Sequence, residues 1–254
     1  DGAVILDGGR IRAVGAAVDL LRDDCSGLPV HDHRGRIIVP GFVDSHIHVA
    51  QTDVIASYGE DLLTWLQRYT FPVEAGFSDA ERARETAAFF LDELLRNGTT
   101  TANVMGTVHP ESVDAVFAAA RVRRMRLIAG KVLMDRHCPA PLQDTASTGY
   151  RDSRALLERW HGCDRLGYAV APRFAPTSSP AQLQAAGRLV AEFPEVHLHT
   201  HLAEHQREVA WVRELFPAAR SYLDVYDAAG LLGERSIFAH CIHLEDADWT
   251  RLAA

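Results

Sequence analysis

Cysteine and long apolar runs are scarce in this 254-residue sequence. Its four cysteines, Cys25, Cys138, Cys163 and Cys241, are scattered and form no CxxC pair. This pattern argues against a disulfide framework and indicates reduced thiols in a cytoplasmic protein. No apolar run approaches the roughly 18 residues of a membrane-spanning helix, and the first residues do not resemble a signal peptide.

Positive charge is also in short supply. The chain has 26 Lys and Arg against 34 Asp and Glu, a formal net charge of -8. We therefore expect neither a nucleic acid nor an anionic membrane as the main partner, because both bind basic surfaces. Hydrophobic residues make up 47% of the chain, which is enough for one large core. Histidine is the abundant exception: there are 13, and several are clustered.

The first 40 residues differ from the rest. Residues 4–6 and 11–14 predict a β-hairpin around Asp7-Gly8-Gly9. Residues 36–39 predict a further short strand that ends at Pro40-Gly41. We therefore expect residues 1–40 to form part of a small N-terminal β-unit, and residues 41–254 to form a separate domain.

Strand and helix patterns alternate from Phe42 onward. Helices are predicted after a capping box at residues 78–81, after Ser179-Pro180, and over residues 110–123, 151–161 and 204–215. The predicted strands cover residues 42–46, 99–104, 126–133, 166–171, 196–201 and 236–240. Repeated βα units imply a parallel sheet, and six in a row favour either a (β/α) barrel or a doubly wound sheet.

The pair His46 and His48 follows the first of these strands. Alternate residues of a strand point to the same side, about 7 Å apart, so two imidazoles can share one metal ion. An isolated HxH pair can equally be two surface histidines on a loop. The apolar strand that leads into this pair favours a site, because it places the pair at the strand's C-terminal end, where barrels carry their active sites.

A second cluster covers residues 197–205. Alternation puts His197, His199 and His201 on one face, with His201 at the strand's exit and Glu204 three residues later. A histidine ligand beside a non-ligand acid suits metal-assisted hydrolysis. We expect His197 and His199 to be core histidines with satisfied hydrogen bonds.

A third strand, residues 237–240, also ends in histidine, His240. A doubly wound sheet would spread these histidines along one edge, whereas a barrel brings them to one mouth. A (β/α) barrel is therefore the better prediction. Nitrogen-rich ligation with an open position fits zinc, with iron or manganese as alternatives.

Several segments resemble the amidohydrolase superfamily, and most closely its guanine deaminases. The segment PGFVDSHIH at 40–48 is similar to the superfamily's first-strand signature. The segments that are similar to the guanine deaminases are QTD at 51–53, YG at 58–59, LLTWL at 62–66, YTFPVE at 69–74, MDR at 134–136, APRFAPT at 171–177, HTHLAE at 199–204, YLDVY at 222–226 and AHCIHL at 239–244.

The resemblance implies a distorted (β/α)₈ TIM barrel that binds one zinc ion and deaminates guanine to xanthine and ammonia as a homodimer. The implied metal ligands are His46, His48, His201 and His240. The resemblance also implies that Glu204 moves protons and that Gln51, Arg173 and Phe174 hold the purine. On the residues alone, Arg173 can be in a surface ion pair and Phe174 can be a core residue.

The sequence departs from the family pattern in one respect. The family uses a further metal-binding aspartate some tens of residues beyond the position of His240, but the sequence stops at Ala254. About six of eight βα units are therefore expected here, in a fragment that is unstable or inactive by itself. Alternative functions are deamination of a pterin, an oxidised guanine or a triazine, and a non-catalytic barrel that binds no metal.

Overall fold

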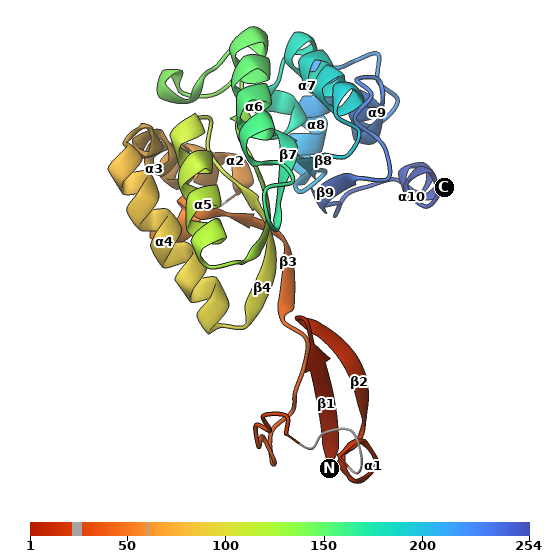
Figure 1. Ribbon diagram of the computed structural model, residues 1–254. Helices are drawn as coiled ribbons and strands as arrows, with labels where there is room; N and C mark the ends of the chain where they lie inside the picture. Colours follow the sequence, from red (N-terminus) through yellow and green to blue (C-terminus); the bar gives the residue numbers. More distant parts are fainter. Residues whose placement is uncertain (22–26, 60) are drawn as a thin grey trace. The chain divides into compact units, whose positions relative to one another are not determined.

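The computed structural model describes residues 1–21, 27–59 and 61–254. These residues divide into two compact units, Asp1–Pro40 and Gly41–Ala254 (Figure 1). Cys138, Cys163 and Cys241 are free thiols, as predicted, and Cys25 lies outside the described residues.

The smaller unit contains the predicted hairpin. Strands β1 (Gly2–Asp7) and β2 (Arg10–Ala16) pair antiparallel, and a short helix α1 (Ala17–Leu20) follows. The turn between the strands is possible because Gly8 and Gly9 take φ values of 55° and 76°, which glycine adopts without strain. The strand predicted at residues 36–39 is wrong. Within the described part of the chain this run pairs with no strand, and Ile37 is 90% exposed.

The larger unit is built on a parallel sheet. Its strands are β3 (Phe42–His48), β4 (Thr99–Met105), β5 (Arg126–Gly130), β6 (Val132–Leu133), β7 (Leu166–Pro172), β8 (His197–Leu202) and β9 (Ser236–His240). They run in the order β3-β4-β5-β7-β8-β9, with β6 paired to β7. Apart from the two-residue strand β6, each strand therefore lies beside the next one along the chain, as the predicted barrel arrangement requires. The strand predicted over residues 126–133 is divided into β5 and β6.

Helices connect the strands and cover the outside of the sheet (Figure 1). The longer ones are α4 (Ala80–Arg96), α5 (Pro110–Val122), α6 (Ala146–Trp160), α7 (Pro180–Glu192) and α8 (Gln206–Leu215). The shorter helical segments are η1 (Val49–Val54), α2 (Leu62–Trp65), η2 (Leu66–Thr70), α3 (Phe71–Ala75), η3 (Gly76–Ser78), η4 (Ala140–Leu142), η5 (Ala175–Thr177), α9 (Tyr222–Asp227) and α10 (Asp246–Leu252). No helix in the described residues is both long and apolar enough to span a bilayer.

Local capping sets where these helices begin. The predicted capping box at residues 78–81 is wrong by one residue, because Asp79 is the N-cap of α4 and accepts hydrogen bonds from the backbone of Glu81 and Arg82. Ser179 caps α7 as predicted, with Pro180 in the first turn. The predicted helix 151–161 begins earlier, at Ala146, because Thr145 forms its own capping box with Thr148.

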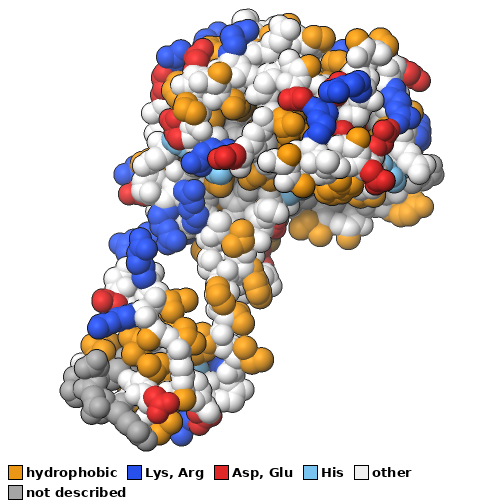
Figure 2. All heavy atoms as spheres, turned by 90° about the vertical axis from the view of Figure 1, so that its right-hand side faces the viewer, with side chains coloured by type: hydrophobic (Ala, Val, Ile, Leu, Met, Phe, Trp, Pro, Cys, Tyr) orange, Lys and Arg blue, Asp and Glu red, His pale blue; other side chains and the backbone are white. Residues whose placement is uncertain are grey.

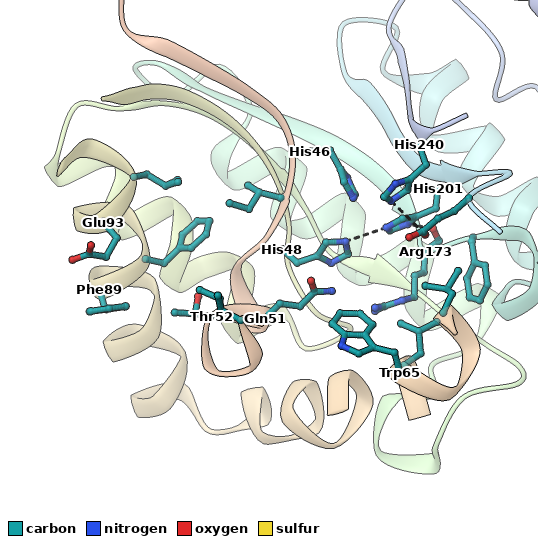
Figure 3. Close-up of a pocket in the computed structure, with 18 of the residues that line it drawn as sticks. His46, His48, Gln51, Thr52, Trp65, Phe89, Glu93, Arg173, His201 and His240 are labelled. Atoms are coloured by element: carbon teal, nitrogen blue, oxygen red, sulfur yellow. Dashed lines mark hydrogen bonds and ion pairs between the residues drawn. The ribbon is translucent and has the colours of Figure 1, made fainter. Parts of the chain in front are cut away.

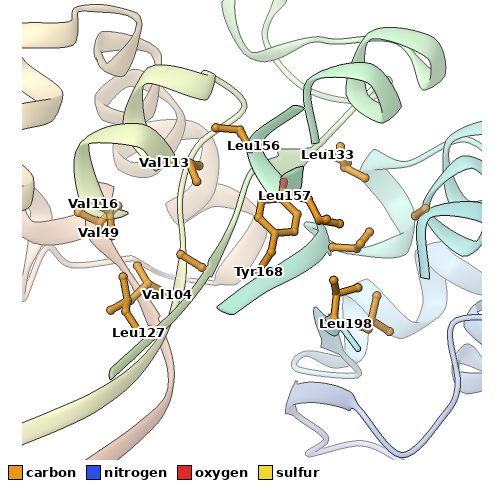
Figure 4. Packing of buried hydrophobic residues seen from close by; sticks show 14 of the residues in the cluster. Val49, Val104, Val113, Val116, Leu127, Leu133, Leu156, Leu157, Tyr168 and Leu198 are labelled. Carbon is orange, nitrogen blue, oxygen red and sulfur yellow. The ribbon is translucent and has the colours of Figure 1, made fainter. Parts of the chain in front are cut away.

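The core lies between the sheet and its helices (Figure 4). Val104 of β4, Leu127 of β5 and Leu198 of β8 are each at most 1% exposed, and they belong to one cluster with Val113 and Val116 of α5. Fully burying a side chain of this size stabilises the fold by roughly 1.5–3 kcal/mol. The packed strands therefore hold their C-terminal ends at fixed positions.

Acidic and basic side chains are intermixed on the face of the larger unit that Figure 2 shows. Exposed ion pairs also form on the larger unit, for example between Arg213 and Glu245, which are 2.9 Å apart. Pairs of this kind contribute about 0–1 kcal/mol each, so the core determines the stability.

Gly130 marks a close approach of two strands. A Cβ atom at this position would lie 1.8 Å from the carbonyl oxygen of Ala169 on β7. We expect Gly130→Ala to reduce the free energy of unfolding of the full-length gene product by roughly 1–3 kcal/mol, because the strands must separate. Thermal unfolding measures this. Gly233→Ala is the control, since nothing lies within 4 Å of its added Cβ, and equal melting temperatures for the two variants would contradict the prediction.

Candidate metal centre and pocket

Histidines from three strand ends converge at one mouth of the sheet. His46 and His48 come from β3, His201 from β8 and His240 from β9, and their rings point toward one another in Figure 3. His46, His201 and His240 each offer one ring nitrogen that could bind a metal. These three atoms all lie within 4.8 Å of one another. His48 is adjacent to this group, with its Nε2 atom 3.0 Å from Nε2 of His201.

The orientation of His201 is set by Arg173, the residue that directly follows strand β7. Its Nδ1 atom donates to the backbone carbonyl of Arg173 at 2.7 Å, since a carbonyl oxygen only accepts. In a neutral ring this leaves Nε2 without a proton and directed toward His48. Such a hydrogen bond from the distal ring nitrogen is typical of histidines that bind metals.

A further histidine orients His46. Nε2 of His199 lies 2.8 Å from Nδ1 of His46. In the tautomer in which Nδ1 of His46 donates this hydrogen bond, Nε2 of His46 carries no proton and can bind a ligand. The expectation that His199 and His197 are satisfied core histidines is wrong in one respect. Nδ1 of each is buried without a hydrogen-bond partner among the described residues. The alternation along β8 indicated that His199 and His201 share a face, but not that His199 reaches β3.

Burial favours the neutral form of the imidazoles of His46, His48, His201 and His240. Burial, with additional repulsion from His240 and Arg173, lowers the pKa of His46 to about 4. Burial also lowers the pKa values of His48 and His201 well below the usual range, and lowers that of His240. Neutral imidazole is the form that binds metals. The converging nitrogen donors of His46, His201 and His240, with His48 beside them, therefore fit a divalent metal of the zinc, iron or manganese type.

Glu204 lies beside this cluster, just after β8. Its Oε2 atom is 3.3 Å from Nε2 of His240. Burial, followed by the charge of Glu208, raises the pKa of Glu204 to about 7, although Arg173 opposes the shift.

His240 takes a φ of 75°, a left-handed conformation that is costly for a residue with a side chain. Such strain is common at functional sites.

Glu208 is a residue that the sequence analysis missed. It is fully buried at the start of α8, where its Oε2 accepts hydrogen bonds from the backbone nitrogens of Glu204 and His205. Its Oε1 accepts one from the hydroxyl of Tyr222. Glu208 therefore holds the backbone turn that presents Glu204. The capping-box spacing from His205 to Glu208 is the signal that could have identified it.

A cavity of about 660 Å³ opens at the histidine cluster. Every residue that the sequence analysis assigned to the site lines it: His46, His48, Gln51, Arg173, Phe174, His201, Glu204 and His240. Leu62, Trp65 and Leu66, from the helical segments that follow β3, add an apolar wall. Figure 3 shows Gln51 and Trp65 on one side of the histidines, and Phe89 and Glu93 on α4 farther away.

Arg173 and Phe174 are both buried, with 2% and 4% of their surfaces exposed. The alternative of a surface ion pair for Arg173 is wrong, because its partner Glu74 is fully buried. Phe174 packs in a satellite hydrophobic cluster and also lines the cavity, so it is a core residue that presents part of its ring to the pocket.

The fold and the site together define the class: a barrel of parallel strands with a candidate metal centre of histidines at the strands' C-terminal ends. The profile of the amidohydrolase family matches residues 37–254, and the chain belongs to this family. The chain is 51% identical to the guanine deaminase of Escherichia coli K12 over 253 residues. This alignment covers 100% of the chain and 58% of that relative.

Two solved structures are similar over nearly the whole chain. The E. coli guanine deaminase superposes with a TM-score of 0.95, covering 100% of this chain and 59% of that one. A guanine deaminase from C. acetobutylicum with guanine bound in its active site is 30% identical and has a TM-score of 0.92, covering 98% of this chain and 59% of that one. The chain thus spans about three fifths of the length of these relatives.

Proposed function

We propose that the protein is a guanine deaminase, which converts guanine and water to xanthine and ammonia. The observation that carries this proposal is the single cavity that joins the histidine cluster and Glu204 to Gln51, Arg173 and Phe174. The similarity to guanine deaminases at 51% identity supports it.

The residues that would hold the metal are His46, His48, His201 and His240. Zinc is the proposed ion, since the four candidate ligands are nitrogen donors, and iron or manganese is the alternative. When bound, the metal supplies Lewis acidity that lowers the pKa of water at the site. The geometry of His201, held by the carbonyl of Arg173, presents its free nitrogen to the cluster.

Glu204 is the proposed proton carrier. Its carboxylate takes a proton from the attacking water, whose oxygen adds to the ring carbon that bears the exocyclic amine. Glu204 delivers this proton to the adjacent ring nitrogen. It then takes the remaining proton from the hydroxyl now bonded to the ring carbon and delivers it to the amine, so that the carbon–nitrogen bond breaks, ammonia leaves and the carbonyl of xanthine forms. The position of Oε2, 3.3 Å from Nε2 of His240 and on the cavity wall, supports this role.

Three residues are proposed to hold the purine. Arg173 donates to carbonyl or ring-nitrogen acceptors, and Gln51 both donates and accepts, which suits an edge that carries both kinds of group. Phe174 offers an aromatic surface against the flat ring.

The proposal is tested by assaying the full-length gene product with guanine. Equal release of ammonia and xanthine is the expected result, and loss of activity on chelation with recovery on adding zinc would support the metal. A panel of a pterin, 8-oxoguanine and a triazine tests the alternative substrates. Faster turnover of any of these than of guanine, or a protein that holds no metal, would contradict the proposal.

Replacing Phe174 tests its contact with the purine. We expect Phe174→Leu to raise KM for guanine about 2–10-fold with a smaller effect on kcat, because an aromatic contact contributes about 0.5–1.5 kcal/mol. Phe117→Leu is the control, since Phe117 is fully buried in the main core and does not line the cavity. Steady-state kinetics measure both. An unchanged KM in Phe174→Leu would refute the contact.

The cytoplasmic location and the homodimer stay predictions. Size-exclusion chromatography with light scattering of the full-length gene product measures the oligomeric state directly.

A further inference from the structure

Glu74 is a fully buried carboxylate that the proposed reaction does not use. It lies on α3, and burial raises its pKa while the neighbouring Arg173 opposes that shift. Both of its oxygens accept hydrogen bonds from Nη1 of Arg173, at 2.9 and 2.7 Å. Burying either charge alone would be costly, so each charge of this pair compensates the other.

Only one nitrogen of the guanidinium, Nη1, donates to Glu74. In the part of the chain that the structure describes, no acceptor is recorded for Nη2 or Nε of Arg173. The guanidinium also lies over the ring of Phe71, 5.2 Å from its centroid, and the side chain lines the cavity. Glu74 and Phe71 therefore fix the plane of the guanidinium while leaving donors available to a ligand.

The ion pair also determines the charge that a ligand meets. Arg173 and Glu74 are an oppositely charged pair at 2.7 Å, so the positive charge of Arg173 is offset by a carboxylate beside it. Glu204, when ionised, adds a negative charge. A neutral ligand can accept hydrogen bonds from Arg173 without displacing Glu74. An anion gains little net attraction, because in this medium of low polarity the repulsion of Glu74 offsets the attraction of Arg173.

We propose that Glu74 is a positioning residue that determines specificity. It holds Arg173 in place as a hydrogen-bond donor and compensates its positive charge, so the cavity prefers neutral purines to purine anions. The inference rests on the proposed function for the identity of the purine. It also implies easier release of xanthine, which ionises more readily than guanine.

The test compares two purine inhibitors of similar size at one neutral pH, with the full-length gene product. Urate is an anion under these conditions and hypoxanthine is neutral. We expect Glu74→Gln to tighten inhibition by urate relative to hypoxanthine by about tenfold or more, as one uncompensated charge at short range predicts. A bound metal ion attracts urate equally in the variant and the wild type, so its effect drops out when the two are compared.

Two controls separate this role from a structural one. Asp144→Asn disrupts another buried ion pair, in which Asp144 lies 2.6 Å from Lys131 and away from the cavity. It should lower the melting temperature and leave the urate-to-hypoxanthine ratio unchanged. Glu74→Asp keeps the charge, so it should keep the wild-type ratio while raising KM for guanine.

An unchanged ratio in Glu74→Gln would overturn the inference even if guanine turnover is intact. If Glu74→Gln does not fold, the Glu74→Asp variant decides. A tenfold change of its urate-to-hypoxanthine ratio would overturn the inference, whereas the wild-type ratio together with a raised KM for guanine would support the inference. Failure of the wild-type protein to deaminate guanine would instead refute the proposed function, so the two failures are distinguishable.

Discussion

Glu204→Gln should reduce kcat for guanine by about 10²–10⁴-fold, the range that removal of a positioned general acid and base costs. The amide fills the same space but cannot take a proton from water. Because Glu204 is one of several residues on the cavity wall, we expect guanine still to bind. Steady-state kinetics and direct binding of guanine to the full-length gene product measure both quantities.

The matched control for this prediction is Glu214→Gln. Glu214 lies on α8, the helix that follows Glu204, but it is exposed and does not line the cavity. It should keep wild-type kcat. If Glu204→Gln retains most of the wild-type kcat, another group moves the protons and the proposed role of Glu204 is wrong.

His201→Ala should remove both the metal and the activity. His201 is central to the cluster, with its Nε2 atom 3.0 Å from that of His48 and within the group formed with His46 and His240. Because even partners in the outer shell of a metal site are worth about 10–100-fold in affinity, loss of His201 itself should cost more than that. Metal content by mass spectrometry and turnover of guanine measure the two effects.

The matched control for this variant is His205→Ala. His205 caps α8, where its Nδ1 atom accepts a hydrogen bond from the backbone of Arg207, and it is not part of the cluster. Its replacement should lower stability slightly and leave the metal content unchanged. A His201→Ala protein with a full complement of metal would show that the ion binds elsewhere.

The barrel could be predicted because its signals are local. Alternation of strand and helix patterns indicated a parallel sheet, and strands ending in histidine indicated which edge carries the site. The predicted strands at residues 99–104 and 236–240 match β4 and β9 to within one residue. The strand predicted at residues 36–39 failed because apolar content does not supply a pairing partner, which is a property of the folded chain.

The sequence alone determined the kinds of chemical group available and their order along the chain, since strand periodicity decides which side chains share a face. Only the tertiary structure decided which of those groups meet. His199 reaches His46 across 153 residues, and Glu74 reaches Arg173 across 99. No local pattern encodes such contacts, because they depend on how the strands are ordered and how the helical segments after β3 pack over the mouth.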